Sequence, residues 1–508
     1  MISLELESEH GWLLETLLFL VVFGAVYLLL KSLPRQTFRW VFPIVNALLL
    51  TVFTVFYSGQ FPLLLKEQVA LFSGLHHIQS QLHQNQSINA LLKDNRLLLV
   101  DVSHDLALIP DSSLNASWRS NQLITDRQKL AQFLKSLTNE QDSSRYFVDM
   151  VVCDLTFGSL SPNKAQDEAL QAAFDSLNAQ HHLLIAKSDL TESKSVHDNS
   201  AVNTEVLDGG SVDITKYYDG TFFTYDFFDS TERHLASLPT VLYNRLMAAP
   251  SKPGCPPSSS AQAKGFIKSD LFVPEFWIDN EDVSRETESE SESAHPWLPP
   301  LFNWGEAESD TSLENATGRL LPNLFRLGEV TDPDTTEFGG RTAFLEQLRD
   351  NYNHCKRSIV FIGLFEDSDR DMHHTLVGQM HGSILLINMF MNLLAGSHLI
   401  GFGYLLYLMA GFWGVGYLLM QEPHHLKKKA PSKKSGSWIK LTNWLREKGY
   451  TFAQRLINNQ AYILAFLVLL GAIAFFNHLI NLVVIGVYIA TVTEVFEELY
   501  HHESEHHE

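Results

Sequence analysis

Acidic and histidine side chains follow three apolar runs that have the composition of buried β-strands. The runs are RLLLVDVSHDLALI, YFVDMVVCDLTFG and SIVFIGLF. Because the carboxyl ends of parallel strands meet at one edge of a sheet, we expect these side chains to lie close together, where ligands of open α/β sheets bind. The candidate ligand-binding residues are Asp101, His104, Asp105, Asp154, Asp371, His373 and His374.

Two interpretations of these residues remain open. Crowded carboxylates repel one another, so they favour a bound cation, a ligand amine or a basic partner, and a site for Ca²⁺ or another hard cation is conceivable. Alternatively, the aspartates cap helices and tie down loops. The sequence does not identify a metal.

Enzyme motifs are missing from the sequence. It contains no G-x-S-x-G, no H-E-x-x-H and no glycine-rich loop of the kind that cradles phosphates. We therefore predict a non-enzymatic protein without a cofactor.

The elements that must position the candidate residues alternate between strand and helix patterns. The helical stretch DRQKLAQFLKSLTNE lies between the first and second apolar runs. The helical stretch ALQAAFDSLNA lies between the second run and a further strand, HHLLIAKS. Strand, helix, strand, helix, strand with short links predicts an α/β domain with a mainly parallel sheet.

Apolar segments at both ends of the chain predict about five transmembrane helices. The predicted domains are a helix pair in 1–61, a juxtamembrane helix in 62–93, the α/β domain in 94–396, a helix in 397–420, a basic loop in 421–460, a helical hairpin in 461–496 and a tail in 497–508. The start of the chain is acidic, which fits a cleaved signal peptide poorly. Asn388 and Asn392 are expected at membrane depth, in a hydrogen-bonding role between helices.

Basic residues predict the orientation. Lys31, Arg35 and Arg39 lie between the first two apolar segments, and the loop 421–460 holds nine Lys or Arg against two Glu. Both should be cytoplasmic, which puts the α/β domain outside and the tail inside. We read the basic loop as a topology signal that contacts anionic lipid.

Charge and cysteine content narrow the choice of partners and pairings. The net charge of −21 argues against nucleic acid binding. Three cysteines, Cys153, Cys255 and Cys355, would allow one disulfide in an exported domain, and the sequence does not choose the pair.

An ordered set of short motifs resembles the CHASE type 2 extracellular sensor domain. The segment from Asp371 through His373 and Thr375 to Gly378 is similar to its D-x-H-x-T-x-x-G-like closing loop, and VVCDLTF to its V-x-x-D-x-x-F strand. Further counterparts are Asp167 before a helix, Ser237 and Leu238 at a helix start, and Trp118 and Arg127 in place of a Trp-Pro-Trp-x-Arg loop. The resemblance implies a bacterial inner-membrane protein with its large domain in the periplasm.

Two functions follow as expectations. The first is a sensory protein that relays a signal to a separate protein partner, since no output domain is recognisable. The alternative is a non-catalytic scaffold subunit of a membrane complex. Membrane lipid, other protein subunits and a second copy of the chain are the expected partners.

Overall fold

A computed structural model describes the chain in separate stretches. These are residues 21–22, 24–25, 35–56, 96–110, 121–137, 148–155, 157, 161, 163–187, 202–204, 206–212, 221–222, 224–226, 235–248, 266–267, 270–272, 323–331, 340–365, 372–375, 378–396, 398–421 and 460–476. The chain divides into two compact units: an α/β unit of Gln84–Gln262 and Glu275–Ser397, and a helical unit of Met1–His83, Ala263–Pro274 and His398–Glu508. The predicted helix in 62–93 lies outside the described residues.

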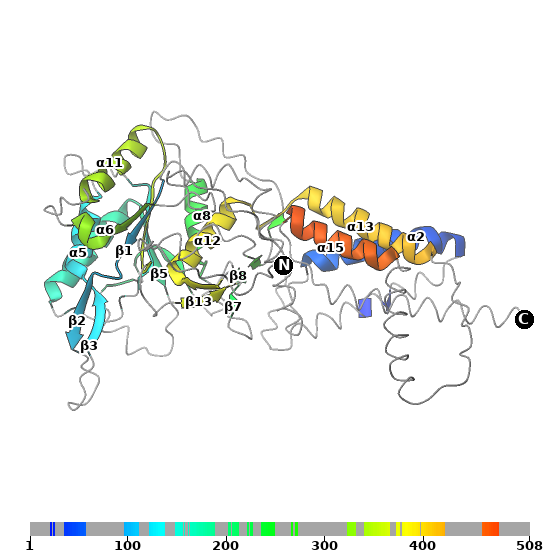
Figure 1. Cartoon of the computed structure of the whole chain (residues 1–508), viewed down its shortest axis with the longest axis horizontal. Helices are drawn as coiled ribbons and strands as arrows, with labels where there is room; N and C mark the ends of the chain where they lie inside the picture. The colour runs from blue at the N-terminus through cyan, green and yellow to red at the C-terminus, as the bar shows by residue number, and fades with distance from the viewer. Residues whose placement is uncertain are drawn as a thin grey trace, which may run out of the picture. The chain divides into compact units, whose positions relative to one another are not determined.

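A six-stranded parallel sheet forms the centre of the α/β unit (Figure 1). In spatial order its strands are β11 (Asn323–Arg326), β1 (Leu97–Asp101), β12 (Ile359–Gly363), β4 (Met150–Cys153), β5 (Leu183–Lys187) and β6 (Gly209–Ser211). Strands β1, β12 and β4 are buried along their whole length, as expected of strands that helices cover on both faces. The predicted parallel α/β sheet is confirmed.

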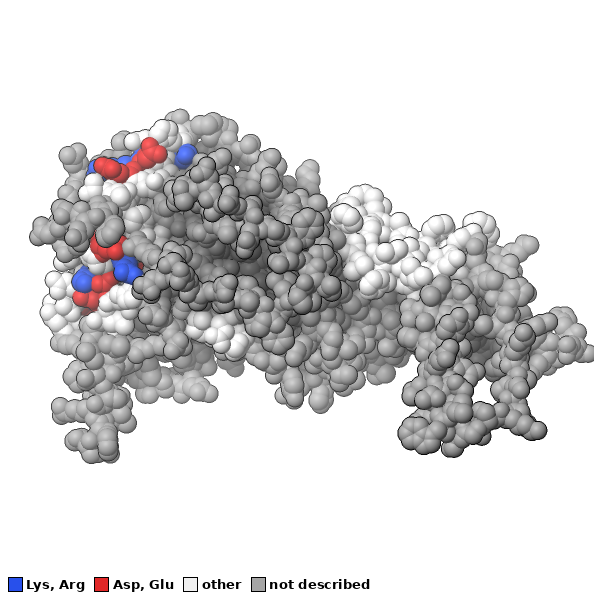
Figure 2. Space-filling view, in the orientation of Figure 1, with Lys and Arg blue, Asp and Glu red and all other residues white. Residues whose placement is uncertain are grey.

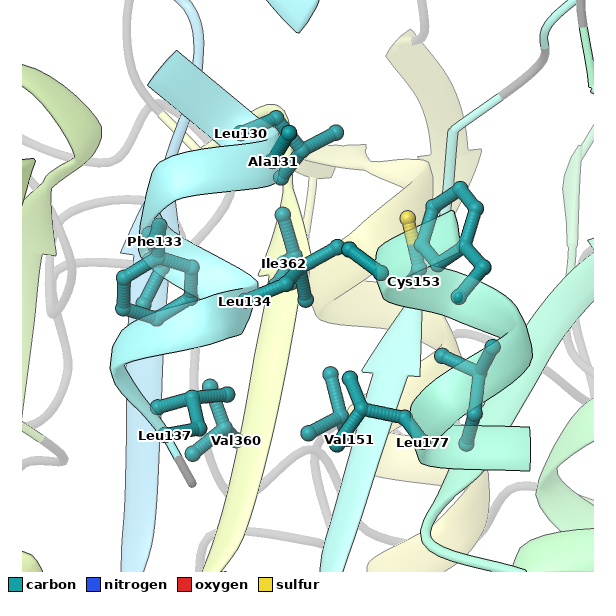
Figure 3. Packing of buried hydrophobic residues seen from close by; sticks show 14 of the residues in the cluster. Leu130, Ala131, Phe133, Leu134, Leu137, Val151, Cys153, Leu177, Val360 and Ile362 are labelled. Atoms are coloured by element: carbon teal, nitrogen blue, oxygen red, sulfur yellow. The ribbon is translucent and has the colours of Figure 1, made fainter. Parts of the chain in front are cut away.

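Helices cover both faces of the sheet. One face packs against α5 (Arg127–Ser136), α6 (Lys164–Ala179), α10 (Leu327–Thr331) and α11 (Gly340–Asn353), whose apolar side chains share a core with alternate strand residues (Figure 3). Helix α8 (Leu238–Ala248) packs against β5, β6 and α12 (Gly382–Leu394), and Ser383 at the start of α12 adjoins Gly363 on the other face of β12.

Local sequence signals explain where the first helices begin. The Asp126 carboxylate accepts hydrogen bonds from the backbone N–H groups of Gln128 and Lys129, and Asn163 caps α6 in the same way through Ala165. Both are N-cap residues that satisfy otherwise unpaired donors of the first turn. They fix the start of α5 and of α6 near the carboxyl edge of the sheet.

Smaller strands accompany the main sheet. The run that we read as one strand ends at Asp101, and its second half forms β2 (Leu106–Pro110), which pairs antiparallel with β3 (Asn121–Thr125). Strand β13 (Met372–Thr375) pairs with β14 (Gly378–His381) and with β7 (Thr221–Phe222), and β8 spans Thr224–Asp226.

Three helices form the core of the helical unit: α2 (Arg35–Phe56), α13 (Phe402–Gln421) and α15 (Gln460–Phe476). Helix α13 packs against both others. A Cβ on Gly416 would lie 3.1 Å from Pro43 Cα of α2, and a Cβ on Gly471 of α15 would overlap the Tyr407 hydroxyl. The unit also contains β9 (Phe266–Ile267), which pairs antiparallel with β15 (Leu399–Ile400), and β10 (Asp270–Phe272).

The prediction of about five transmembrane helices is not supported. Within the described stretches, only Phe402–Met420 is a helix both long and apolar enough to cross a bilayer. Apolar helical segments Trp40–Val55 and Gln460–Ala472 are shorter, because α2 begins with polar residues and the described part of α15 ends before Asn477. Most of 12–30 and all of 477–496 lie outside the described residues.

Asn388 and Asn392 are not part of the membrane-type helices. Both lie in α12 of the α/β unit, where they are fully buried and donate to the backbone carbonyls of Ile384 and Asn388 respectively. The apolar run that suggested membrane depth is the buried helix of a layered sheet.

Candidate binding site at the carboxyl edge of the sheet

The parallel register places four residues in a row across the end of the sheet. Asp101 of β1 lies opposite Arg326 of β11 on one side and Gly363 of β12 on the other. Asp154 follows β4 directly, and its backbone N–H donates to the Ile362 carbonyl at 2.8 Å. The expectation that Asp101 and Asp154 end parallel strands at one edge of the sheet is therefore met, with Gly363 of β12 between them.

Asp101 is fully buried and fastens two loops. Its Oδ1 accepts from the Ser103 hydroxyl at 2.6 Å, from the Ser103 backbone N–H at 3.2 Å and from the Phe365 backbone N–H at 2.9 Å. The side chain thus joins the loop after β1 to the loop after β12. Arg326, its register neighbour, supplies the opposite charge at this edge.

Asp105 connects the loop after β1 to two helices. One carboxylate oxygen accepts from Lys129 Nζ of α5 at 2.6 Å, and the other accepts from the Gly328 backbone N–H at the start of α10 at 2.7 Å. A buried carboxylate with a cation and a backbone donor is well compensated. Its contacts match the interpretation in which the aspartates tie down loops and helix ends.

Asp154 holds the first turn of α12. The Ser383 hydroxyl donates to its Oδ2 at 2.7 Å. Ser383 is itself 1% exposed, and a Cβ on Gly363 would overlap its side chain, so the helix start approaches β12 only because residue 363 is glycine. The first turn of α12 has no acidic residue of its own, and Asp154 supplies negative charge at that helix end.

The predicted histidines do not join this row. His104 is exposed, and His373 lies half-buried in β13 opposite Met380 of β14. His374, in the same strand, is exposed, and Asp371 lies outside the described residues. Within the described part of the chain no three His, Cys, Asp or Glu side chains are grouped as a metal site, so a hard-cation site there is not supported.

A buried ion pair at the same edge was not anticipated as a pair. Arg127 Nη1 at the start of α5 lies 2.8 Å from Asp167 Oδ1 in α6, and the two side chains are only 2% and 5% exposed. The second oxygen of Asp167 accepts from the Ser161 backbone N–H, and the guanidinium lies 5.6 Å from the Phe157 ring centroid. Burial lowers the pKa of Arg127, and the attraction of Asp167 opposes that shift.

Nothing in the spacing of Arg127 and Asp167 predicts their contact, because 40 residues separate them. The signal that could have predicted the pair is the position of each charged residue at the start of a helix. Each charge lies in the first turn of a predicted helix, and each helix comes after a predicted strand of the parallel sheet along the chain. The starts of such helices lie at the same edge.

The cysteines divide into two kinds. Cys153 at the end of β4 is a buried free thiol, and burial raises its pKa far above the ordinary value. Cys355, after α11, is disulfide-bonded. Cys255 is the third cysteine of the chain and lies outside the described residues.

Comparisons of the chain with protein-family models, with curated proteins and with solved structures find no match.

Proposed function

We propose that the chain is an integral membrane protein with a sensory α/β domain outside the cytoplasm, which passes a signal to a separate protein partner. The resemblance to the CHASE type 2 domain motivates the sensory part of this proposal. The observation that carries it is the covalent order of α12 and α13. A helix that starts at the carboxyl edge of the sheet ends at Leu394, and the most membrane-like helix begins eight residues later at Phe402.

The surface of the helical unit supports membrane insertion. Large apolar side chains are exposed along all three helices, and the described surface of this bundle in Figure 2 lacks the charged residues that gather on the α/β unit. The exposed side chains are Trp40, Ile44, Leu48 and Val52 on α2, Phe402, Leu406, Trp413 and Tyr417 on α13, and Ile463, Phe466, Leu467 and Phe475 on α15. Soluble proteins rarely expose contiguous apolar surface of this extent.

The interior of the bundle supports the same conclusion. Asn46 of α2 is 1% exposed and donates to the Phe412 carbonyl of α13 at 3.4 Å. Small residues at the helix contacts let the backbones approach closely, as in membrane bundles. Gly416 faces Asn46 and Pro43, and Gly411 faces Val468.

Helix direction supports the predicted orientation. Contacts of Gly416 with Pro43 and of Gly471 with Tyr407 run in opposite senses along the paired helices, so α2 and α15 are both antiparallel to α13. The start of α2 at Arg35 and the two ends joined by the basic loop 421–460 therefore lie at one end of the bundle. With that end cytoplasmic, the chain between Phe56 and Phe402 begins and returns on the opposite side.

The disulfide supports an oxidising compartment for the α/β unit. Disulfides persist in the periplasm and are rare in the cytosol. Without reduction, unfolded protein from native membranes should carry one maleimide group, on Cys153, and after reduction it should carry three. Three groups without reduction would contradict an extracytoplasmic α/β unit.

A structural scaffold is the second candidate, and the carboxyl edge favours it. Asp101, Asp105 and Asp154 each hold a loop or helix end of the same chain. A domain in which these three aspartates hold its own loops and helix ends can serve as a platform for other subunits.

One experiment separates the two candidates. The full chain is purified in mild detergent from its native membrane, its bound proteins are identified by mass spectrometry, and its thermal stability is measured against a panel of small molecules and metal ions. A sensor gains about 2.7 kcal/mol from a ligand at a hundred times its dissociation constant. A stabilisation that Asp154→Asn abolishes supports sensing. No stabilisation together with a fixed-ratio set of bound subunits would overturn it in favour of the scaffold.

A further inference from the structure

A hydrogen bond and a close approach to a glycine hold the start of α12 at the sheet. Ser383 donates to Asp154 Oδ2 at 2.7 Å, and its side chain occupies the space where a Cβ of Gly363 would lie. His381, at the N-cap position, makes no capping hydrogen bond to the helix. The Ser383 hydroxyl is therefore a specific side-chain attachment of this helix end to β4.

The rest of α12 is a continuous buried helix. Every residue from Gly382 to Leu393 is buried, and the Asn388 and Asn392 side chains donate back to carbonyls of the same helix at 3.0 and 2.8 Å. At the far end, the backbone N–H groups of Ala395 and Gly396 bond to Met391 and Leu393. The first turn and the far end of α12 are thus joined by one continuous hydrogen-bonded element.

We propose that the Ser383–Asp154 contact over Gly363 is a latch, and that its opening moves or loosens α12 and so changes the segment that leads into α13. A cation or hydrogen-bond donor that binds the Asp154 carboxylate and turns it away from Ser383 opens the latch, because such a ligand binds the open state more tightly than the closed state. The role of the latch in signalling rests on the proposed sensory function, whereas the existence of the latch rests on the contacts described above.

Two substitutions test the latch in the full chain in lipid nanodiscs. Ser383→Ala removes the donor and leaves the backbone unchanged. Gly363→Ala inserts a methyl group into the space of Ser383 and pushes the helix start away. Gly401→Ala is the matched control, because a Cβ there meets nothing within 4 Å.

The measured quantity is the rate of amide hydrogen exchange in α12 and in residues 398–405, which lead into the first turn of α13. Both latch variants should exchange roughly tenfold faster along the whole of α12, the factor expected for loss of a buried hydrogen bond to a charged acceptor. Exchange should also rise where the Tyr404 and Leu405 N–H groups bond to Gly401. Gly401→Ala should leave the exchange of α12 unchanged.

Two results would overturn the latch. One is faster exchange confined to 381–385, which would mean that the contact is local and carries nothing. The other is equally faster exchange in α5, on the opposite face of the sheet, which would mean general loosening of the domain. Neither result bears on membrane insertion or ligand binding, so the latch can fail while the proposed function stands, and the ligand panel can fail while the latch stands.

Discussion

The buried ion pair between Arg127 and Asp167 allows a quantitative test of the α/β unit. Replacing Arg127 by Met keeps much of the side-chain volume and removes the charge. Asp167 then stays buried at 5% exposure with the Ser161 backbone N–H as its remaining hydrogen-bond donor. Asp167→Asn leaves the opposite charge, the Arg127 guanidinium, without its carboxylate.

Each single substitution should lower the free energy of unfolding by about 3–5 kcal/mol, since breaking a buried pair strands one charge away from water. At about 2 °C per kcal/mol for a domain of this size, the melting temperature should fall by about 6–10 °C. The double variant Arg127→Met with Asp167→Asn buries no charge at this site. It should be more stable than the sum of the two losses implies, by about 1–3 kcal/mol.

Thermal unfolding of the full chain, followed by tryptophan fluorescence in one detergent, measures all three variants. Glu168→Gln is the control, because Glu168 pairs with Lys164 on the exposed side of α6, at 66% and 86% exposure. That exposed pair should change stability by no more than about 0.5 kcal/mol. Additive losses in the double variant, or single losses no larger than that of the control, would refute the buried pair.

Three further predictions concern other parts of the fold. Leu134→Ala, in the core of Figure 3, should destabilise the α/β unit by about 2–5 kcal/mol, because it leaves a cavity in the core. The same melting experiment measures this loss. A loss under about 1 kcal/mol would contradict the complete burial of Leu134. Burial alone would raise the pKa of Asp208, but hydrogen bonds from Arg245 and a nearby histidine outweigh it and hold that pKa below its ordinary value. The Asp208 carboxylate therefore stabilises the fold above about pH 4 and loses this effect as the pH falls through the lowered pKa. The difference in melting temperature between wild type and Asp208→Asn should be largest near about pH 7 and vanish near about pH 2. An unchanged difference across that range would argue against the pair. Gly471→Ala would place a methyl group on the Tyr407 hydroxyl, which donates to two carbonyls of α15. This substitution should lower the yield of monodisperse protein in detergent. An unaffected yield would contradict the close helix contact.

The sequence predicted the sheet well because its strands are continuous apolar runs. Leu97–Asp101, Met150–Cys153 and Ile359–Gly363 are buried on both faces, and such runs are readable without knowing their neighbours. Their order was not readable. Strand β12 lies between β1 and β4 although it comes last of the three in the chain, and only long-range packing decides that insertion.

Of the candidate site, the shared edge of Asp101 and Asp154 was predicted, whereas their contacts and the separate places of the histidines were not. The edge that gathers Asp101 and Asp154 follows from strand direction, whereas their partners come from distant segments. The Phe365 N–H, Ser383 and the register neighbour Arg326 belong to parts of the chain that no local pattern links to those aspartates. Hydrogen bonds of this kind depend on the final register, which composition and periodicity do not encode.

The expectation that Asn388 and Asn392 lie at membrane depth was wrong for a physical reason, since both belong to α12 of the α/β unit. Apolar composition alone does not separate a buried helix from a spanning one, and α12 is as apolar as a membrane segment although it is covered by the α/β unit.

The side of the membrane on which the α/β unit lies is the central claim, and cysteine labelling tests it most directly. Cys153 is buried and Cys355 is bonded, so the wild-type chain is a low-labelling background. A cysteine in place of Lys164, which is 86% exposed, should react with a membrane-impermeant maleimide in cells whose outer membrane alone is permeable. A cysteine in place of Lys434 in the basic loop should react only after the inner membrane is opened. The reverse pattern, or equal labelling of both sites in intact inner membranes, would contradict the proposed orientation.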